Sequence, residues 1–95
     1  MDLRIVQGAV QPGQVEAVAR LWEETVGVEL AHLPEFRRAF VGGDPAGTSF
    51  VVVTAWERFP DPAISRRLLA GFEERVRGLV AGPLAVEELA LLVEV

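Results

Sequence analysis

The chain has 95 residues, of which 51% are hydrophobic, and its 14 acidic and 9 basic residues give a formal net charge of −5. All of the basic residues are arginines scattered along the sequence, so the clustered cations that bind nucleic-acid phosphates or anionic membranes are missing. The absence of cysteine excludes disulfides, thiolate metal sites and a cysteine nucleophile.

A single domain spanning residues 1–95 is the expectation for a chain of this length. The N-terminus lacks a basic segment followed by an apolar one, and no apolar run reaches the roughly 18 residues that a membrane helix needs. We therefore expect a soluble, cytoplasmic protein.

The first half of the chain begins with an alternating pattern that predicts a strand over residues 2–10, which Gln11-Pro12-Gly13 ends. A helix is predicted over residues 13–29, because apolar residues recur at helical spacing on one face. That face consists of Val15, Val18, Ala19, Trp22 and Val26. A connector that carries the only histidine, His32, follows.

The strongest β-forming run lies over residues 48–58, TSFVVVTAWER. Residues 35–41 predict the strand before it, and the loop of residues 42–47 makes the two a hairpin. Both faces of the run are apolar: Phe50, Val52, Thr54 and Trp56 alternate with Val51, Val53 and Ala55. A strand of this kind must be covered on both faces.

The last part of the chain predicts a helix and a strand. Asp61 is a good N-cap and Pro62 a good first residue for a helix over residues 62–81. Its apolar seam consists of Ile64, Leu68, Phe72, Val76 and Val80. Gly82-Pro83 ends this helix, and residues 84–95 predict the final strand.

The element order is therefore β-α-β-β-α-β, which predicts a ferredoxin-like α+β fold with two helices on one face of an antiparallel sheet. No element within the chain covers the other face, although the third and fourth strands carry apolar residues on both faces. A homodimer that packs the two open sheet faces together would cover them.

With this order in place, the chain resembles the antibiotic-biosynthesis-monooxygenase-like family of dimeric α/β barrels. The resemblance covers nearly the whole chain and rests on VQPGQVEAVARLW, LPEFRRAFVGGDPAG, SFVVVTAWER and GPLAVEELALLVEV. It implies two ferredoxin-like subunits joined into a barrel-like dimer, with a small-molecule pocket between sheet and helices in each. It also implies cofactor-free oxygenation of aromatic or quinol-like substrates. The haem-degrading branch uses a second-helix histidine and a first-strand asparagine, and this chain has neither.

Three residues are candidates for a catalytic role. Trp56 falls at the tryptophan that ends the third strand in many family members, where it could stack on a planar substrate and donate its indole N–H to it. Gln7 is the amide nearest to the position of the haem degraders' asparagine. His32 would be the general base, because its ordinary pKa lies near neutrality. The alternatives are a core tryptophan and an exposed loop histidine.

Ligand binding is the other predicted role. Trp22 and Phe72 point from their helices at the sheet, where they could line a pocket or simply fill the core. Arg66 and Arg67 could hold an anionic ligand, and Arg67 is the candidate for this role; a solvated face is the alternative. Adjacent carboxylates such as Glu87-Glu88 point in different directions, so we expect no metal site, and we expect no cofactor.

Three functions follow from these observations. The first is a cofactor-free monooxygenase-like site for a small aromatic ligand. The second is a non-catalytic binding or assembly module, in which Trp22, Trp56 and Phe72 fill the gap between sheet and helices and leave no cavity. The third, an RNA-recognition module, requires exposed basic and aromatic residues on the sheet, and the acidic composition disfavours it.

Overall fold

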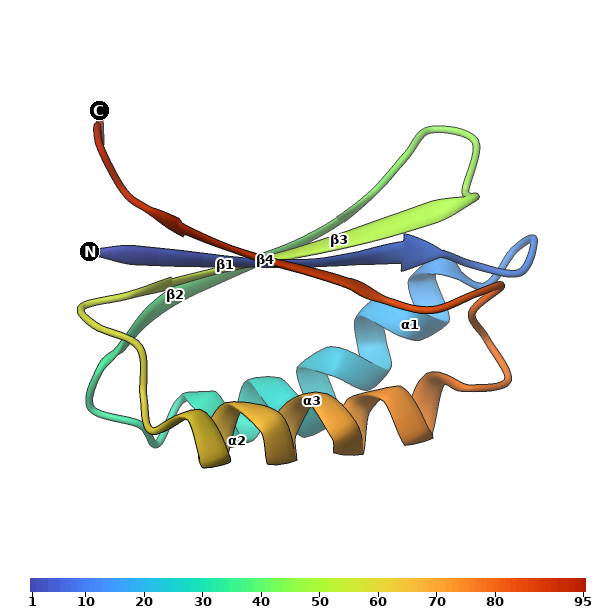
Figure 1. Cartoon of the computed structure of the whole chain (residues 1–95). Coiled ribbons are helices and arrows are strands. Elements are labelled where there is room, and N and C mark those ends of the chain that lie inside the picture. Colours follow the sequence, from blue (N-terminus) through green and yellow to red (C-terminus); the bar gives the residue numbers. More distant parts are fainter.

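The computed structural model describes all of residues 1–95 and consists of a four-stranded antiparallel sheet with helices on one face (Figure 1). The strands lie in the order β2-β3-β1-β4. They are β1 (Asp2–Ala9), β2 (Phe36–Gly43), β3 (Ser49–Trp56) and β4 (Ala85–Ala90). The helical segments are α1 (Val15–Trp22), η1 (Glu23–Gly27), α2 (Val28–Leu30) and α3 (Pro62–Val76). The predicted ferredoxin-like α+β fold is confirmed.

The first helical region is interrupted where a continuous helix was predicted. A π-helical turn, η1, separates α1 from α2. The Thr25 hydroxyl donates to the carbonyl of Leu21 at 2.6 Å, a local bond that competes with the regular backbone ladder. At Gly27, an added Cβ would lie 3.3 Å from the Trp22 ring, so this glycine lets the indole lie against the backbone. Wide π turns of this kind are frequent at functional sites.

Helix α3, which was predicted to extend to residue 81, ends at Val76, because the backbone that follows it pairs with the end of β1. The amide of Gln11 donates to the carbonyl of Leu79, and the amide of Ala81 donates to the carbonyl of Ala9. Val10 and Val80 form an isolated bridge. These bonds require an extended chain, which a continuing helix could not provide.

The last strand ends at Ala90 although its alternating pattern continues to Val95. β4 is an edge strand that pairs only with β1, and Asp2 is the partner of Ala90. The amide of Leu91 still donates to the carbonyl of Met1. The final segment leaves the sheet on the side away from the helices, and Leu92, Val93 and Val95 are exposed (Figure 1).

The hairpin between β2 and β3 is closed by Asp44. Its carboxylate accepts hydrogen bonds from the Thr48 amide at 2.7 Å, the Thr48 hydroxyl at 2.5 Å and the Ser49 amide at 3.0 Å. These bonds, led by the one from the Thr48 hydroxyl, hold the pKa of Asp44 below its ordinary value. Gly47, with φ of 71°, supplies the left-handed conformation that the turn requires.

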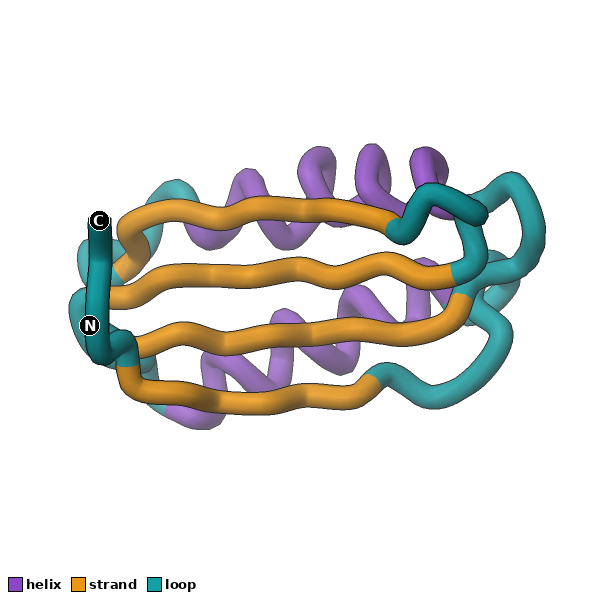
Figure 2. Tube along the Cα trace, turned by 90° about the horizontal axis from the view of Figure 1, so that it is seen from above, coloured by secondary structure: helices purple, strands orange, loops and turns teal.

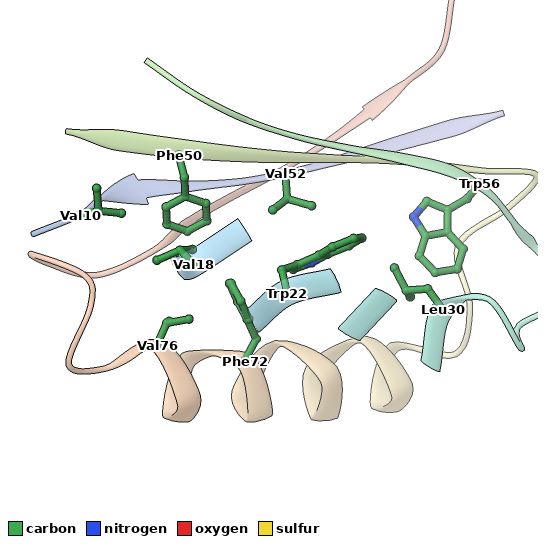
Figure 3. Packing of buried hydrophobic residues seen from close by; sticks show 9 residues of the cluster. All are labelled: Val10, Val18, Trp22, Leu30, Phe50, Val52, Trp56, Phe72 and Val76. Carbon is green, nitrogen blue, oxygen red and sulfur yellow. The ribbon is translucent and has the colours of Figure 1, made fainter. Parts of the chain in front are cut away.

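The core lies between the sheet and the helices. Phe50, Val52 and Trp56 point from β3 towards the helices, and Phe72 and Val76 point back from α3 (Figure 3). Trp22 lies between the two layers. The opposite sheet face has no covering element within the chain (Figure 2). No helix is long and apolar enough to span a membrane.

Candidate functional site

A cavity of about 420 Å³ lies between the helix-facing side of the sheet and the helices. This volume falls within the range of about 300–1,000 Å³ that is typical of small-molecule sites. Eleven of the 18 residues that line it are hydrophobic. The predicted site therefore has an open space, which a fully packed core would lack.

The deep wall of the cavity is aromatic. Trp22, Trp56 and Phe72, three of the predicted site residues, all line it. Trp56 packs edge-on against Phe36, with the ring centres 5.4 Å apart, and Phe72 packs edge-on against Phe50 at 6.2 Å. Because these neighbours hold the rings in place, the wall is preorganised for a planar ligand.

The indole N–H of Trp56 has a partner within the sheet. It donates to the Thr54 hydroxyl at 2.9 Å, and this hydroxyl in turn donates to the backbone carbonyl of Arg4 at 3.4 Å. Trp56 is only 1% exposed. The sequence suggested that this N–H donates to a substrate; in the structure it is already engaged, so Trp56 offers the cavity an apolar surface.

Arg4 is a partly buried charge in the cavity wall, and its side chain is 16% exposed. It comes from β1, on the same face as Thr54 and Val6. Its Nη1 donates to the Ser65 hydroxyl of α3 at 3.0 Å, and its Nη2 donates to Glu88 of β4 at 3.3 Å. The guanidinium carbon lies 4.7 Å from the centre of the Phe59 ring and 5.9 Å from that of Trp56. A cation is thus held over aromatic faces at the side of the cavity.

The outer part of the cavity is bounded by β4 and by the first turns of α3. Val86 and Glu88 of β4 contribute to it, and both are about half exposed. Ser65, Arg66 and Leu69 contribute from α3. This rim contains most of the polar side chains of the cavity, whereas the deep wall is apolar.

Three predicted site residues lie away from this cavity. Gln7 pairs with Val51 on the sheet face opposite to Arg4 and Val6, which is the face without helices. His32 is exposed in the turn that follows α2 and is not among the lining residues. Arg67 points outward and forms an ion pair with Glu29 at 3.2 Å. The cavity gives these three predicted roles no support, and Arg66, which we also considered, lines the cavity instead of Arg67.

Several lining residues were not predicted from the sequence to bind a ligand. They are Arg4, Thr54, Phe59, Ser65 and Glu88. The alternating pattern of the first strand could have indicated Arg4, because Arg4 is two residues before Val6 and is therefore expected on the same face of β1. Glu88 could not be placed without the register that sets it opposite Arg4.

Arg37 and Arg38 avoid the core through a β-bulge. The register of β2 against β3 shifts between Phe36 and Arg38. Arg37, whose side chain is 44% exposed, forms an ion pair with Glu57 outside the core. No group of three or more histidine or acidic side chains lies close enough together to hold a metal ion.

The fold and the cavity together define a ferredoxin-like α+β domain with a ligand-sized space between its two layers. No protein-family model matches the sequence, and no curated protein matches it. Solved structures do match the fold over almost the whole chain.

One of these is a monooxygenase from the gene ActVA-Orf6 of Streptomyces coelicolor, in complex with the ligand Nanaomycin D. It is 19% identical, with a TM-score of 0.78 over 99% of this chain and 89% of that one. A structure described as an antibiotic biosynthesis monooxygenase is 17% identical, with a TM-score of 0.70 over 98% of this chain and 100% of that one. Rv0793 from Mycobacterium tuberculosis is also 17% identical, with a TM-score of 0.71 over 98% and 96%. The predicted resemblance to antibiotic biosynthesis monooxygenases is confirmed at the level of the fold.

Proposed function

We propose that the protein binds a small aromatic molecule between its sheet and its helices and oxygenates it without a cofactor. The observation that carries this proposal is the cavity of about 420 Å³, which has an aromatic deep wall and a charged side. One solved structure with the same fold contains a monooxygenase and the ligand Nanaomycin D. Aromatic or quinol-like compounds are the substrate class that fits this wall.

The proposed chemistry asks little of the protein. In cofactor-free oxygenation, the substrate loses a proton and itself supplies the electrons that reduce dioxygen. The site must exclude water, orient the ring and stabilise developing negative charge. Trp22, Trp56 and Phe72 support the first two tasks, and Arg4 supports the third.

A non-catalytic binding or assembly module remains the alternative function. The cavity is evidence against the version of this module that has no space between the sheet and the helices. That version required Trp22, Trp56 and Phe72 to fill the gap between the layers. All three instead border an open space. A binding protein without turnover would still use the same cavity, so only an activity measurement separates the two functions.

The test is oxygen uptake with a panel of dihydroxy-aromatic compounds. Trp56 is nearly inaccessible, so its replacement would perturb the core as well as the site. Val86→Trp is preferable, because Val86 is 45% exposed at the rim and a larger ring there would obstruct entry. The matched control is Val28→Trp, at a residue 55% exposed and outside the cavity.

We expect oxygen uptake in the wild type and in Val28→Trp, and its loss in Val86→Trp. Absence of uptake with every compound, together with measurable binding, would leave a binding module and overturn the oxygenase proposal. Equal oxygen uptake in the wild type and in Val86→Trp would mean that the reaction does not take place in this cavity.

We also propose a homodimer formed through the open sheet face. Leu3, Ile5, Val51 and Val53 lie on this face, and Phe40, on the same face, is 60% exposed. Its charges are arranged for a second copy: Arg38 lies on the β2 edge and Glu87 on the β4 edge. A two-fold axis parallel to the strands brings the β2 edge of one copy over the β4 edge of the other, where opposite charges meet.

Sedimentation velocity at micromolar concentration tests this assembly. Phe40→Asp places a charge on the proposed interface and should give a monomer, since burying an unpaired carboxylate is strongly unfavourable. Val28→Asp, on the helical side, should leave the dimer intact. A wild-type protein that sediments only as single chains would overturn the proposed homodimer.

A further inference from the structure

The side chain of Arg4 is a cation with more hydrogen-bonding capacity than the protein uses. A guanidinium carries five N–H donors. Only two side-chain hydrogen bonds are made by Arg4, one to Ser65 and one to Glu88. The group is mostly removed from water, at 16% exposure, and lines the cavity. A desolvated cation with unused donors is an attractive site for an anion.

The ion pair that neutralises Arg4 is readily exchanged. Glu88 approaches through a single contact at 3.3 Å, although arginine and carboxylate can form two parallel bonds. The Glu88 side chain is 50% exposed on an edge strand, so water can solvate its carboxylate once it leaves Arg4. Arg4, in contrast, is fixed by Ser65 and by the ring of Phe59.

We propose that Arg4 recognises a negatively charged oxygen on a planar aromatic ligand, and that this oxygen replaces Glu88 as the partner of the guanidinium. The ring of the ligand then lies against the deep wall that Trp22, Trp56 and Phe72 form. The substrate class is thereby narrowed to aromatic carboxylates and other ring compounds that are ionised at neutral pH. This inference rests on the proposed function of the cavity as an aromatic site.

Glu88 then has a role in specificity. Its carboxylate competes with the ligand for Arg4 and repels anions at the rim of the cavity. A neutral aromatic compound neither displaces Glu88 nor satisfies Arg4, so it gains only the apolar contacts. The protein should therefore discriminate between two ligands of the same shape that differ only in charge.

The experiment is isothermal titration calorimetry of the full chain with 2-naphthoate and 2-naphthamide, which share the ring system and differ in charge. Wild-type protein should bind the carboxylate at least about tenfold more tightly, because charge-assisted hydrogen bonds exceed the free-energy difference that a factor of ten requires. Arg4→Met should reduce this preference to about twofold or less while the affinity for the amide is retained.

Glu88→Gln provides a test that does not depend on the folding of the Arg4 variant, because Glu88 lies on the exposed edge strand. It should tighten 2-naphthoate binding by about threefold or more and leave 2-naphthamide unchanged, since it removes a like charge near the ligand. Arg67→Met is the matched control: Arg67 pairs with Glu29 outside the cavity, so the preference should stay at its wild-type value.

Each remaining outcome overturns a defined part of the argument. Equal affinity for the two naphthalenes in the wild type overturns the anion preference and leaves the cavity as a neutral aromatic site. Loss of the preference in Arg66→Met but not in Arg4→Met overturns the assignment to Arg4. Failure of both compounds to bind overturns this inference together with the aromatic site. Absence of oxygen uptake with the preference intact overturns the oxygenase proposal alone.

Discussion

The indole N–H of Trp56 donates to the hydroxyl of Thr54, two residues earlier on the same face of β3, at 2.9 Å. Both side chains are buried, so this bond satisfies a donor that water cannot reach. Thr54→Val keeps the shape of the side chain and removes the acceptor. We expect the free energy of unfolding to fall by about 1–3 kcal/mol, as measured by urea denaturation.

A double-mutant cycle with Trp56→Phe separates this bond from packing. Phenylalanine has no N–H, so Thr54→Val in the Trp56→Phe background should cost clearly less than in the wild type. If the losses of unfolding free energy in the two single variants simply add up in the double variant, there is no hydrogen bond between the two residues that contributes to stability.

Gly42 and Gly43 form a matched pair for a test of packing at the end of β2. A Cβ at Gly43 would lie 2.5 Å from Cγ2 of Val15 and 3.2 Å from the carbonyl of Ser49. Valine is β-branched and stiff, so α1 would have to move, and Gly43→Ala should destabilise the protein by about 1–3 kcal/mol. A Cβ at Gly42 would lie 3.8 Å from its nearest neighbour, Cγ1 of Val51, so Gly42→Ala should leave the midpoint of thermal unfolding nearly unchanged.

Gly71 lies in the interior of α3, is exposed, and has no atom within 4 Å of the position of a Cβ. Gly71→Ala should therefore stabilise the helix by about 0.5–1 kcal/mol, because alanine loses less backbone entropy on folding. The measurement is the midpoint of chemical denaturation. A decrease in stability would mean that this side of α3 faces a partner that the single chain does not contain.

Asp44 predicts a dependence of stability on pH. Its pKa is lower in the folded chain than in the unfolded chain, chiefly because the Thr48 hydroxyl donates to it. The stabilisation is present above the unfolded pKa of about 3.9 and is lost as the pH falls through the lower, folded pKa. Asp44→Asn should be less stable than the wild type at pH 7, and the difference should shrink below about pH 4. A difference that is constant with pH would exclude the carboxylate charge as its cause.

The fold could be predicted because its signals are local and repeated. The alternation of β3 placed Phe50, Val52 and Trp56 on one common face, and the N-cap at Asp61 located the start of α3. Element ends were less accessible to sequence reasoning. The pattern of β4 continues to Val95, but the last pair with β1 joins Asp2 and Ala90, a limit that only the register reveals.

The site was only partly predictable for a related reason. Consecutive residues on a helix point about 100° apart, so an uncertainty of one position separates Arg66, which lines the cavity, from Arg67, which does not. On a strand the same uncertainty reverses the face, and Gln7 lies on the side opposite to Arg4. The partner of Arg4 is 84 positions away in sequence, beyond the reach of any local pattern.

One border of the cavity is β4, the only strand of the cavity wall that lies at the edge of the sheet. β4 is exposed along its whole length and is hydrogen-bonded only to β1. Its amides should therefore exchange with deuterium sooner than those of the central strands. We therefore expect a ligand to enter the cavity by displacing β4 while the buried aromatic rings keep their places. The mobile border of the cavity and its rigid wall thus belong to different parts of the chain.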